Sequence, residues 1–195
     1  MQGLLIILSS PSGGGKTSVI QKILARDPER FVYSISATTR KPRPGEIEGK
    51  DYFFMTESEF RQGIENGKFL EWESVHGHLY GTPRDYIDSC LKKGKHILFD
   101  IDVNGALKVA KVLPEQTLTI FLAPPSIETL IQRLKSRNTD SAEEINTRLQ
   151  RIPMEMEKAR LFDYVVVNQD LDTTVAQVLE IIDNFSKQKS DALAQ

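Results

Sequence analysis

A segment near the start of the chain has the residue types and the spacing of a loop that binds phosphate groups. The phosphate-loop pattern is G-x-x-x-x-G-K-[ST] between a strand and a helix, and the matching residues are Ser10, Pro11, Ser12, Gly13, Gly14, Gly15, Lys16 and Thr17. Glycines let backbone N–H groups turn toward a phosphate chain, and the next helix adds the positive end of its dipole. Lys16 would reach the β and γ phosphates, and the Thr17 hydroxyl can ligate Mg²⁺. We therefore predict that residues 10–17 bind ATP.

The first position of this loop departs from the pattern, because Ser10 stands where glycine is usual. If the position required a positive φ, serine would carry a strain of about 1–2 kcal/mol. The other positions match, and a strand before with a helix after favours a phosphate site over a chance glycine-rich turn.

The elements that must position this loop alternate between strand and helix signals. Such alternation predicts an α/β fold with a mostly parallel sheet flanked by helices. A helix follows the loop, another starts near Thr82 and Pro83 and stops at Gly94, and the last runs from about 172 to 187 before a frayed polar tail. Apolar runs predict strands at 4–8, 96–99, 117–122 and 164–167.

Two stretches interrupt that alternation. Residues 34–84 indicate an inserted subdomain, with a helix capping box at Thr56 and Glu59. Residues 126–155 indicate a helical lid, with Ser126 and Ser141 as helix caps. We expect one domain over 1–195, with its core at 1–33, 85–125 and 156–195.

Composition excludes several classes of protein. A formal net charge of −2 argues against a protein that coats nucleic acid. The single cysteine, Cys90, excludes an internal disulfide. No apolar run approaches the roughly 20 residues of a membrane span, and residues 4–8 lack the basic flank of a signal peptide. We expect a cytoplasmic protein without membrane or nucleic-acid partners, and the sequence leaves monomer and homo-oligomer open.

A longer set of motifs resembles the guanylate kinases of the bacterial type. Residues 36–46 and 49–54 resemble their nucleoside-monophosphate site, and residues 69–72, 80–82, 100–105 and 137–140 continue the match in order over nearly the whole chain. The resemblance implies a P-loop NTPase fold, with 34–84 binding GMP. It also implies transfer of the γ-phosphoryl group of ATP to GMP with Mg²⁺, in purine nucleotide metabolism.

The resemblance also implies roles for the residues that bind GMP. Arginine suits the dianionic phosphate because its guanidinium donates two parallel hydrogen bonds. A carboxylate satisfies both donors of guanine, N1–H and the 2-amino group, and adenine would leave it unpaired. The phosphate is assigned to Arg40, Arg43, Tyr52 and Tyr80, and the base to Ser36, Glu71, Thr82 and Asp102.

Further roles concern the transfer itself. Arg137 and Arg148, in the lid, resemble the arginines that close over the transferring group and act with Lys16 and Arg40. Asp100 resembles the acidic residue that holds Mg²⁺ through water, and Asn168 lies near adenine. Asp100 and Asp102 alternate along one predicted strand and should share a face, although strand-end aspartates can instead cap the next helix.

Three alternatives remain open at this point. Asp102 to Gly105 matches the D-x-x-G of GTPases, but residues 168–171 do not supply their Asn-Lys-x-Asp. A non-catalytic peptide-binding module of the same family would lose phosphate-loop residues, and this loop is intact. A kinase for another monophosphate is disfavoured by Glu71.

Overall fold

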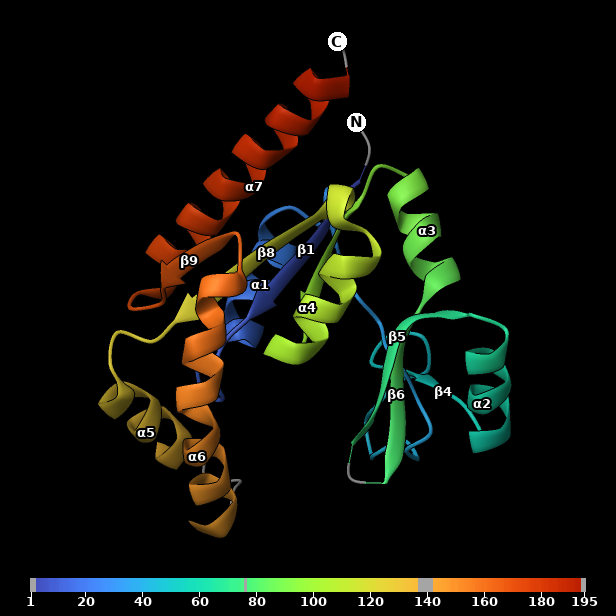
Figure 1. Ribbon diagram of the computed structural model, residues 1–195, viewed down its shortest axis with the longest axis horizontal. Helices are drawn as coiled ribbons and strands as arrows, with labels where there is room; N and C mark the ends of the chain where they lie inside the picture. Colours follow the sequence, from blue (N-terminus) through green and yellow to red (C-terminus); the bar gives the residue numbers. More distant parts are fainter. Residues whose placement is uncertain (1–2, 76, 137–141, 194–195) are drawn as a thin grey trace.

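The centre of the fold is a five-stranded parallel sheet, as the computed structural model shows for residues 3–75, 77–136 and 142–193 (Figure 1). The strand order is β2-β7-β1-β8-β9, and every neighbouring pair is parallel. This confirms the predicted α/β class. The bounds are β1 Leu5–Ser9, β2 Phe31–Tyr33, β7 His96–Asp100, β8 Thr117–Ala123 and β9 Tyr164–Val167.

Helices cover both faces of this sheet, which explains why its inner strands are mostly apolar. Alternate residues of β1 face opposite layers: Ile6 packs with α1 and α7, and Ile7 packs with α3 and α4. All of β1 and β8 is buried. The helices are α1 Lys16–Arg26, α3 Arg84–Lys92, α4 Val103–Val112 and α7 Leu171–Leu193.

A second, four-stranded sheet lies beside the first, at the lower right of Figure 1. Its order is β4-β3-β6-β5, and its own small core includes Phe60 and Phe69, whose rings stack with centroids 4.3 Å apart. The predicted capping box is confirmed, because Thr56 and Glu59 bond reciprocally at the start of α2. The elements are β3 Ala37–Thr38, β4 Phe53–Phe54, α2 Glu57–Glu65, β5 Phe69–Val75 and β6 His78–Pro83.

Two further helices follow β8, at the lower left of Figure 1: α5 Ile127–Ser136 and α6 Ala142–Lys158. Ser126 caps α5 as predicted, since its Oγ accepts the Thr129 N–H at 3.2 Å, whereas the predicted cap Ser141 lies outside the described residues. Short 3₁₀ turns, Pro114–Gln116 and Ala159–Leu161, precede β8 and β9. Over the described ranges no helix has the length and apolarity to cross a membrane.

The structure corrects three expectations about element ends. Thr82 and Pro83 belong to β6, so the proline is the residue before α3 and not its first helical residue. The polar tail after 187 is helical as far as Leu193, where Lys189 pairs with Glu115 at 2.8 Å. Strand β7 ends one residue before Ile101, so Asp102 does not continue it.

Candidate functional site

The phosphate loop joins β1 to α1 at the carboxyl edge of the main sheet. Gly13 and Gly15 adopt φ values of 85° and 89°, a left-handed backbone that other residues rarely take. The Gly14 N–H donates to the Pro11 carbonyl at 2.9 Å. The sequence therefore supplies glycine at both left-handed turns of the loop.

Side-chain packing explains why the loop tolerates so little bulk. A Cβ on Gly14 would lie 2.5 Å from Ser10 Oγ, and one on Gly15 would lie 2.5 Å from Asn168 Nδ2. Asn168 is buried, and its amide donates to the Gly14 carbonyl at 2.7 Å. The hydroxyl of Ser10, the residue that departs from the pattern, donates to the Pro11 carbonyl at 2.9 Å. Ser10 and Asn168 thus hold the backbone of the loop by hydrogen bonds to its carbonyl groups.

The first turn of α1 meets the end of β7 at a cluster suited to a phosphate-bound cation. Thr17 Oγ1 donates to Asp100 Oδ2 at 2.7 Å, and Lys16 Nζ lies 3.7 Å from Asp100 Oδ1. Among the described residues no group of three or more acidic, histidine or cysteine side chains could hold a metal ion. Mg²⁺ commonly takes only one or two protein oxygens beside water and phosphate oxygens. The oxygens of Thr17 and Asp100 fit that donor set.

Helix α6 contacts the same loop through Ser12. Arg148 Nη1 donates to Ser12 Oγ at 3.1 Å, and the backbone of Ser12 acts to lower the pKa of the carboxyl of Glu155, on the same helix as Arg148. Glu155 is 8% exposed, and its Oε2 accepts no hydrogen bond. Burial raises the pKa of its carboxyl, with Arg151 and Lys16 acting in the opposite direction. The predicted lid residue Arg137 lies outside the described residues.

Glu155 is a contact that sequence reasoning missed. Ile152, Glu155 and Ala159 are all buried at the spacing of one helix face. An acidic residue within an otherwise apolar helical stripe was the available signal, because a carboxylate is rarely buried without a polar partner.

Arg40, which the sequence analysis assigns to the phosphate of GMP, forms an ion pair with a carboxylate. Its Nη1 and Nη2 donate to the two oxygens of Glu46 at 2.9 and 2.7 Å, and the Arg43 N–H also donates to Glu46 at 2.7 Å. This hydrogen bonding raises the pKa of Arg40 and lowers that of Glu46. Glu46, which the sequence analysis did not single out, orders the guanidinium by accepting these two parallel hydrogen bonds.

Both predicted tyrosines gather around that arginine. The Arg40 guanidinium lies 5.2 Å from the centroid of the Tyr52 ring, and Tyr80 contributes to the raised pKa of Arg40. The rings of Tyr52 and Tyr80 meet edge to face at 6.1 Å. These three side chains form one cluster, while Arg43 is exposed beside it.

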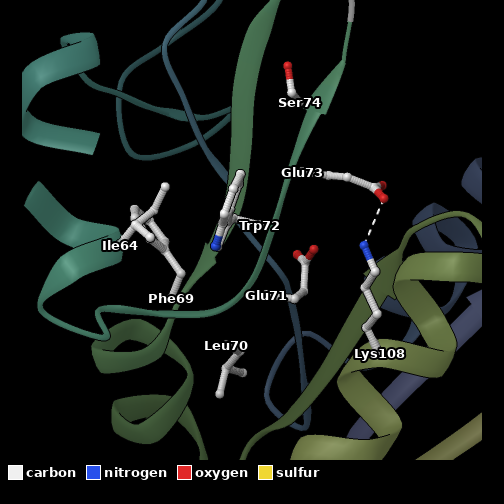
Figure 2. A pocket seen from close by; sticks show the side chains of 8 residues that line it. All are labelled: Ile64, Phe69, Leu70, Glu71, Trp72, Glu73, Ser74 and Lys108. Atoms are coloured by element: carbon white, nitrogen blue, oxygen red, sulfur yellow. Dashed lines mark hydrogen bonds and ion pairs between the residues drawn. The ribbon is translucent and has the colours of Figure 1, made fainter. Parts of the chain in front are cut away.

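The residues predicted to meet a guanine base also converge. Thr82 Oγ1 donates to Glu71 Oε1 at 2.7 Å, and burial raises the pKa of the Glu71 carboxyl, which the Thr82 bond partly offsets. Strands β3 and β6 are antiparallel with Ala37 opposite Gly81, so Ser36 directly precedes a residue that pairs with the neighbour of Thr82. Glu71 lines a pocket of about 600 Å³ between β5 and α4 (Figure 2).

Asp102 differs from the expectation that it shares a strand face with Asp100. It precedes α4, and its Oδ1 accepts the Gly105 N–H at 2.8 Å, so it caps that helix. An N-cap residue satisfies backbone donors that the helix itself leaves unpaired. Its charge still acts on Glu71 and raises the pKa of that carboxyl.

Comparisons with known proteins agree on one family. A family model described as guanylate kinase matches residues 2–185. A guanylate kinase of a Wolbachia from Brugia malayi is 44% identical over 97% of this chain and 96% of its own, and one of Thermotoga maritima is 45% identical over 93% and 87%. The crystal structure of a guanylate kinase from Anaplasma phagocytophilum superposes with a TM-score of 0.72 at 35% identity, covering 94% of this chain and 86% of the other.

Proposed function

The chain belongs to the guanylate kinase family, and from that premise we propose that it transfers the γ-phosphoryl group of ATP to GMP, forming ADP and GDP. A phosphate loop alone indicates a nucleotide but not an acceptor. The observation that carries the choice of acceptor is the half-buried carboxylate of Glu71, bonded by Thr82 and facing the pocket between β5 and α4.

Guanine is the base whose edge this carboxylate fits. Its N1–H and 2-amino group donate in parallel, and Glu71 can accept both while Ser36 and Thr82 offer hydroxyls beside it. Adenine lacks that donor pair and would leave a buried charge unpaired, at a cost of several kcal/mol. Asp102 adds negative charge near the base while it caps α4.

The phosphate of GMP binds at Arg40, with Arg43 and the hydroxyls of Tyr52 and Tyr80. Arg40 is held by Glu46 before substrate arrives, so little rotational freedom is lost when a phosphate binds. A phosphate oxygen of GMP is already ionised near pH 7 and attacks the γ-phosphorus as the bond to the bridging oxygen of ADP breaks. No general base is required for this step.

The donor ATP binds along residues 10–17, with Asn168 bracing the loop near adenine. Lys16 neutralises charge on the β and γ phosphates. Thr17 and Asp100 would hold Mg²⁺, whose chemistry is to neutralise phosphate charge and orient the γ-phosphoryl group. The 2.7 Å bond between these two side chains supports that assignment.

The lid, residues 126–155, closes over the transferring group and brings Arg137 and Arg148 to it. The contact of Arg148 with Ser12 supports a lid that reaches the loop. Closure also excludes water, which otherwise would hydrolyse ATP. The remaining parts are a core at 1–33, 85–125 and 156–195 and a GMP-binding insert at 34–84. We assign the activity to purine nucleotide metabolism in the cytoplasm.

Formation of ADP from ATP and Mg²⁺ tests the proposal, with GMP, AMP, UMP or CMP as acceptor. We expect turnover with GMP that is lost in Lys16→Ala and retained in the surface variant Lys187→Ala. EDTA should abolish turnover. Thr17→Ser, which keeps the hydroxyl, should retain more of the Mg²⁺-dependent turnover than Thr17→Val. GMP binding without turnover would indicate a non-catalytic module, and equal turnover with AMP would contradict the acceptor assignment.

A further inference from the structure

Three charged side chains meet where β5 faces α4. Glu71 and Glu73 are two residues apart on β5, so they project from the same side of the strand. Lys108 on α4 places its Nζ 2.8 Å from Glu73 Oε1. Figure 2 shows the Glu73 side chain extending toward α4, with the dashed bond running from Lys108 to Glu73 and not to Glu71.

Lys108 is nonetheless attracted by both carboxylates. Glu73 has the strongest influence on its ammonium, and Glu71 and Asp102 add to it in the same direction. Glu73 is 42% exposed, whereas Glu71 is buried enough that its ionised form is disfavoured. A cation gains more from a carboxylate that water screens poorly than from an exposed one. Without Glu73, Lys108 would therefore be drawn to Glu71.

Such a shift would occupy the carboxylate needed for recognition of the base. Thr82 already donates to Glu71 Oε1, and guanine would add two more donors. An ammonium on Glu71 would compete with both guanine donors. It would also remove the unpaired charge that makes adenine unfavourable.

We propose that Glu73 is a positioning residue for guanine recognition, which holds the Lys108 ammonium away from Glu71 so that the Glu71 carboxylate stays free for the base. The proposal rests on the proposed function, in which Glu71 accepts the guanine donors. An exposed ion pair contributes little to stability, so the main consequence of the Glu73–Lys108 pair is where it keeps the lysine.

A double-mutant cycle at these two positions tests the proposal by measuring KM for GMP, KM for ATP and kcat. Glu73→Ala should raise KM for GMP about fivefold, the ratio expected when a partly exposed ion pair competes with the ligand. KM for ATP and kcat should not change. Lys108→Met should leave KM for GMP within about twofold, and adding it to Glu73→Ala should restore the normal value, because no ammonium remains to reach Glu71.

If the Glu73–Lys108 ion pair only joins β5 to α4, the outcome should be different. In that case Glu73→Ala, Lys108→Met and the double variant would raise KM for GMP equally, and the proposal would be wrong. An unchanged KM in Glu73→Ala would overturn it as well. The charge-removing variant Glu73→Gln, which keeps the shape of the side chain, repeats the test if the alanine variant folds poorly.

Glu71→Gln separates failure of this proposal from failure of the proposed function. If Glu71→Gln leaves the preference for GMP intact, the guanine assignment itself fails. If Glu71→Gln abolishes that preference while the Glu73 variants behave normally, only the positioning role of Glu73 fails.

Discussion

The proposed ATP loop and the proposed GMP site are built in opposite ways. The proposed ATP loop, residues 10–17, depends on backbone conformation, with left-handed glycines and buried support from Asn168. The proposed GMP site depends on charged side chains, because Arg40 is held by Glu46 and Glu71 by Thr82.

The two sites should therefore differ in the substitutions that they tolerate. A site formed by the backbone tolerates no added side-chain atom, because the sheet and its helices fix the chain on both sides. A side-chain site keeps its backbone after substitution and loses only the particular hydrogen bonds. Intramolecular partners such as Glu46 keep the arginine ordered before the ligand binds, so less entropy is lost on binding.

Two glycines with nearly the same φ give the sharpest contrast. Gly15 and Gly45 have φ values of 89° and 90°, but only the Cβ of an alanine at position 15 would meet another atom, Asn168 Nδ2 at 2.5 Å. We expect Gly15→Ala to lower kcat/KM for ATP roughly 100-fold, since left-handed strain and displacement of Asn168 add. Steady-state kinetics at saturating GMP measures this loss.

Gly45→Ala is the matched control. It carries the same strain of about 1–2 kcal/mol in unfolding free energy, but nothing lies within 4 Å of the new Cβ. KM for ATP should not change. Equal losses in the two variants would show that strain alone, without the Asn168 contact, limits the ATP loop.

Glu71→Gln probes the side-chain site at its most selective point. The amide can accept one guanine donor but not both, and it leaves no unpaired charge against adenine. We expect the ratio of kcat/KM for GMP to that for AMP to fall roughly 30-fold. Glu65→Gln, at the exposed end of α2, should keep the ratio, and an unchanged ratio in both variants would remove Glu71 from base recognition.

Arg40→Lys should have a smaller effect, confined to GMP. Lysine keeps the charge but cannot donate two parallel hydrogen bonds, so KM for GMP should rise about tenfold. KM for ATP should stay constant. Arg61→Lys, which disturbs only an exposed pair with Glu57 on α2, should change neither constant, and a rise in KM for ATP with Arg40→Lys would mean that the two sites are coupled.

An effect on stability, and not on kinetics, concerns the core that carries the proposed ATP loop. His96 is 5% exposed, its Nδ1 accepts the Leu4 N–H at 3.1 Å just before β1, and burial lowers its pKa to about 4. Between pH 6.5 and about 4 the unfolded chain binds a proton that the folded one excludes, so stability falls as the pH falls. The contribution of this histidine approaches about 1.4 kcal/mol per pH unit.

Denaturant unfolding at pH 7 and pH 5 measures that slope. His96→Asn keeps an acceptor for the Leu4 N–H and should lose this part of the pH dependence. His78→Asn, at an exposed position, should retain the full dependence. Equal slopes in both variants would assign the effect to carboxylates instead.

Much of the fold followed from local pattern. The four strands predicted at 4–8, 96–99, 117–122 and 164–167 are present within a residue or so of their predicted bounds, because continuous apolar runs suit strands buried on both faces. The phosphate loop was recognisable because its function requires glycine at particular backbone angles, and glycine is visible in the sequence. The Thr56 capping box is equally local.

Local sequence pattern did not predict short strands or contacts between residues that are far apart in the chain. Strand β2, Phe31–Tyr33, has only three residues and was not predicted. For Asp102 the sequence offered both a strand face shared with Asp100 and a helix-capping role, and the end of β7 at Asp100 decides for the cap.

By itself, the sequence determined the fold class and the glycine positions of the loop at residues 10–17, because these depend on residue type and local spacing. Only the tertiary structure decided which charges meet. Glu46 with Arg40 and Lys108 with Glu73 are pairs set by how the second sheet folds and packs against α4. An ionic contact extends over a few ångströms in space, and separation along the chain carries little information about it.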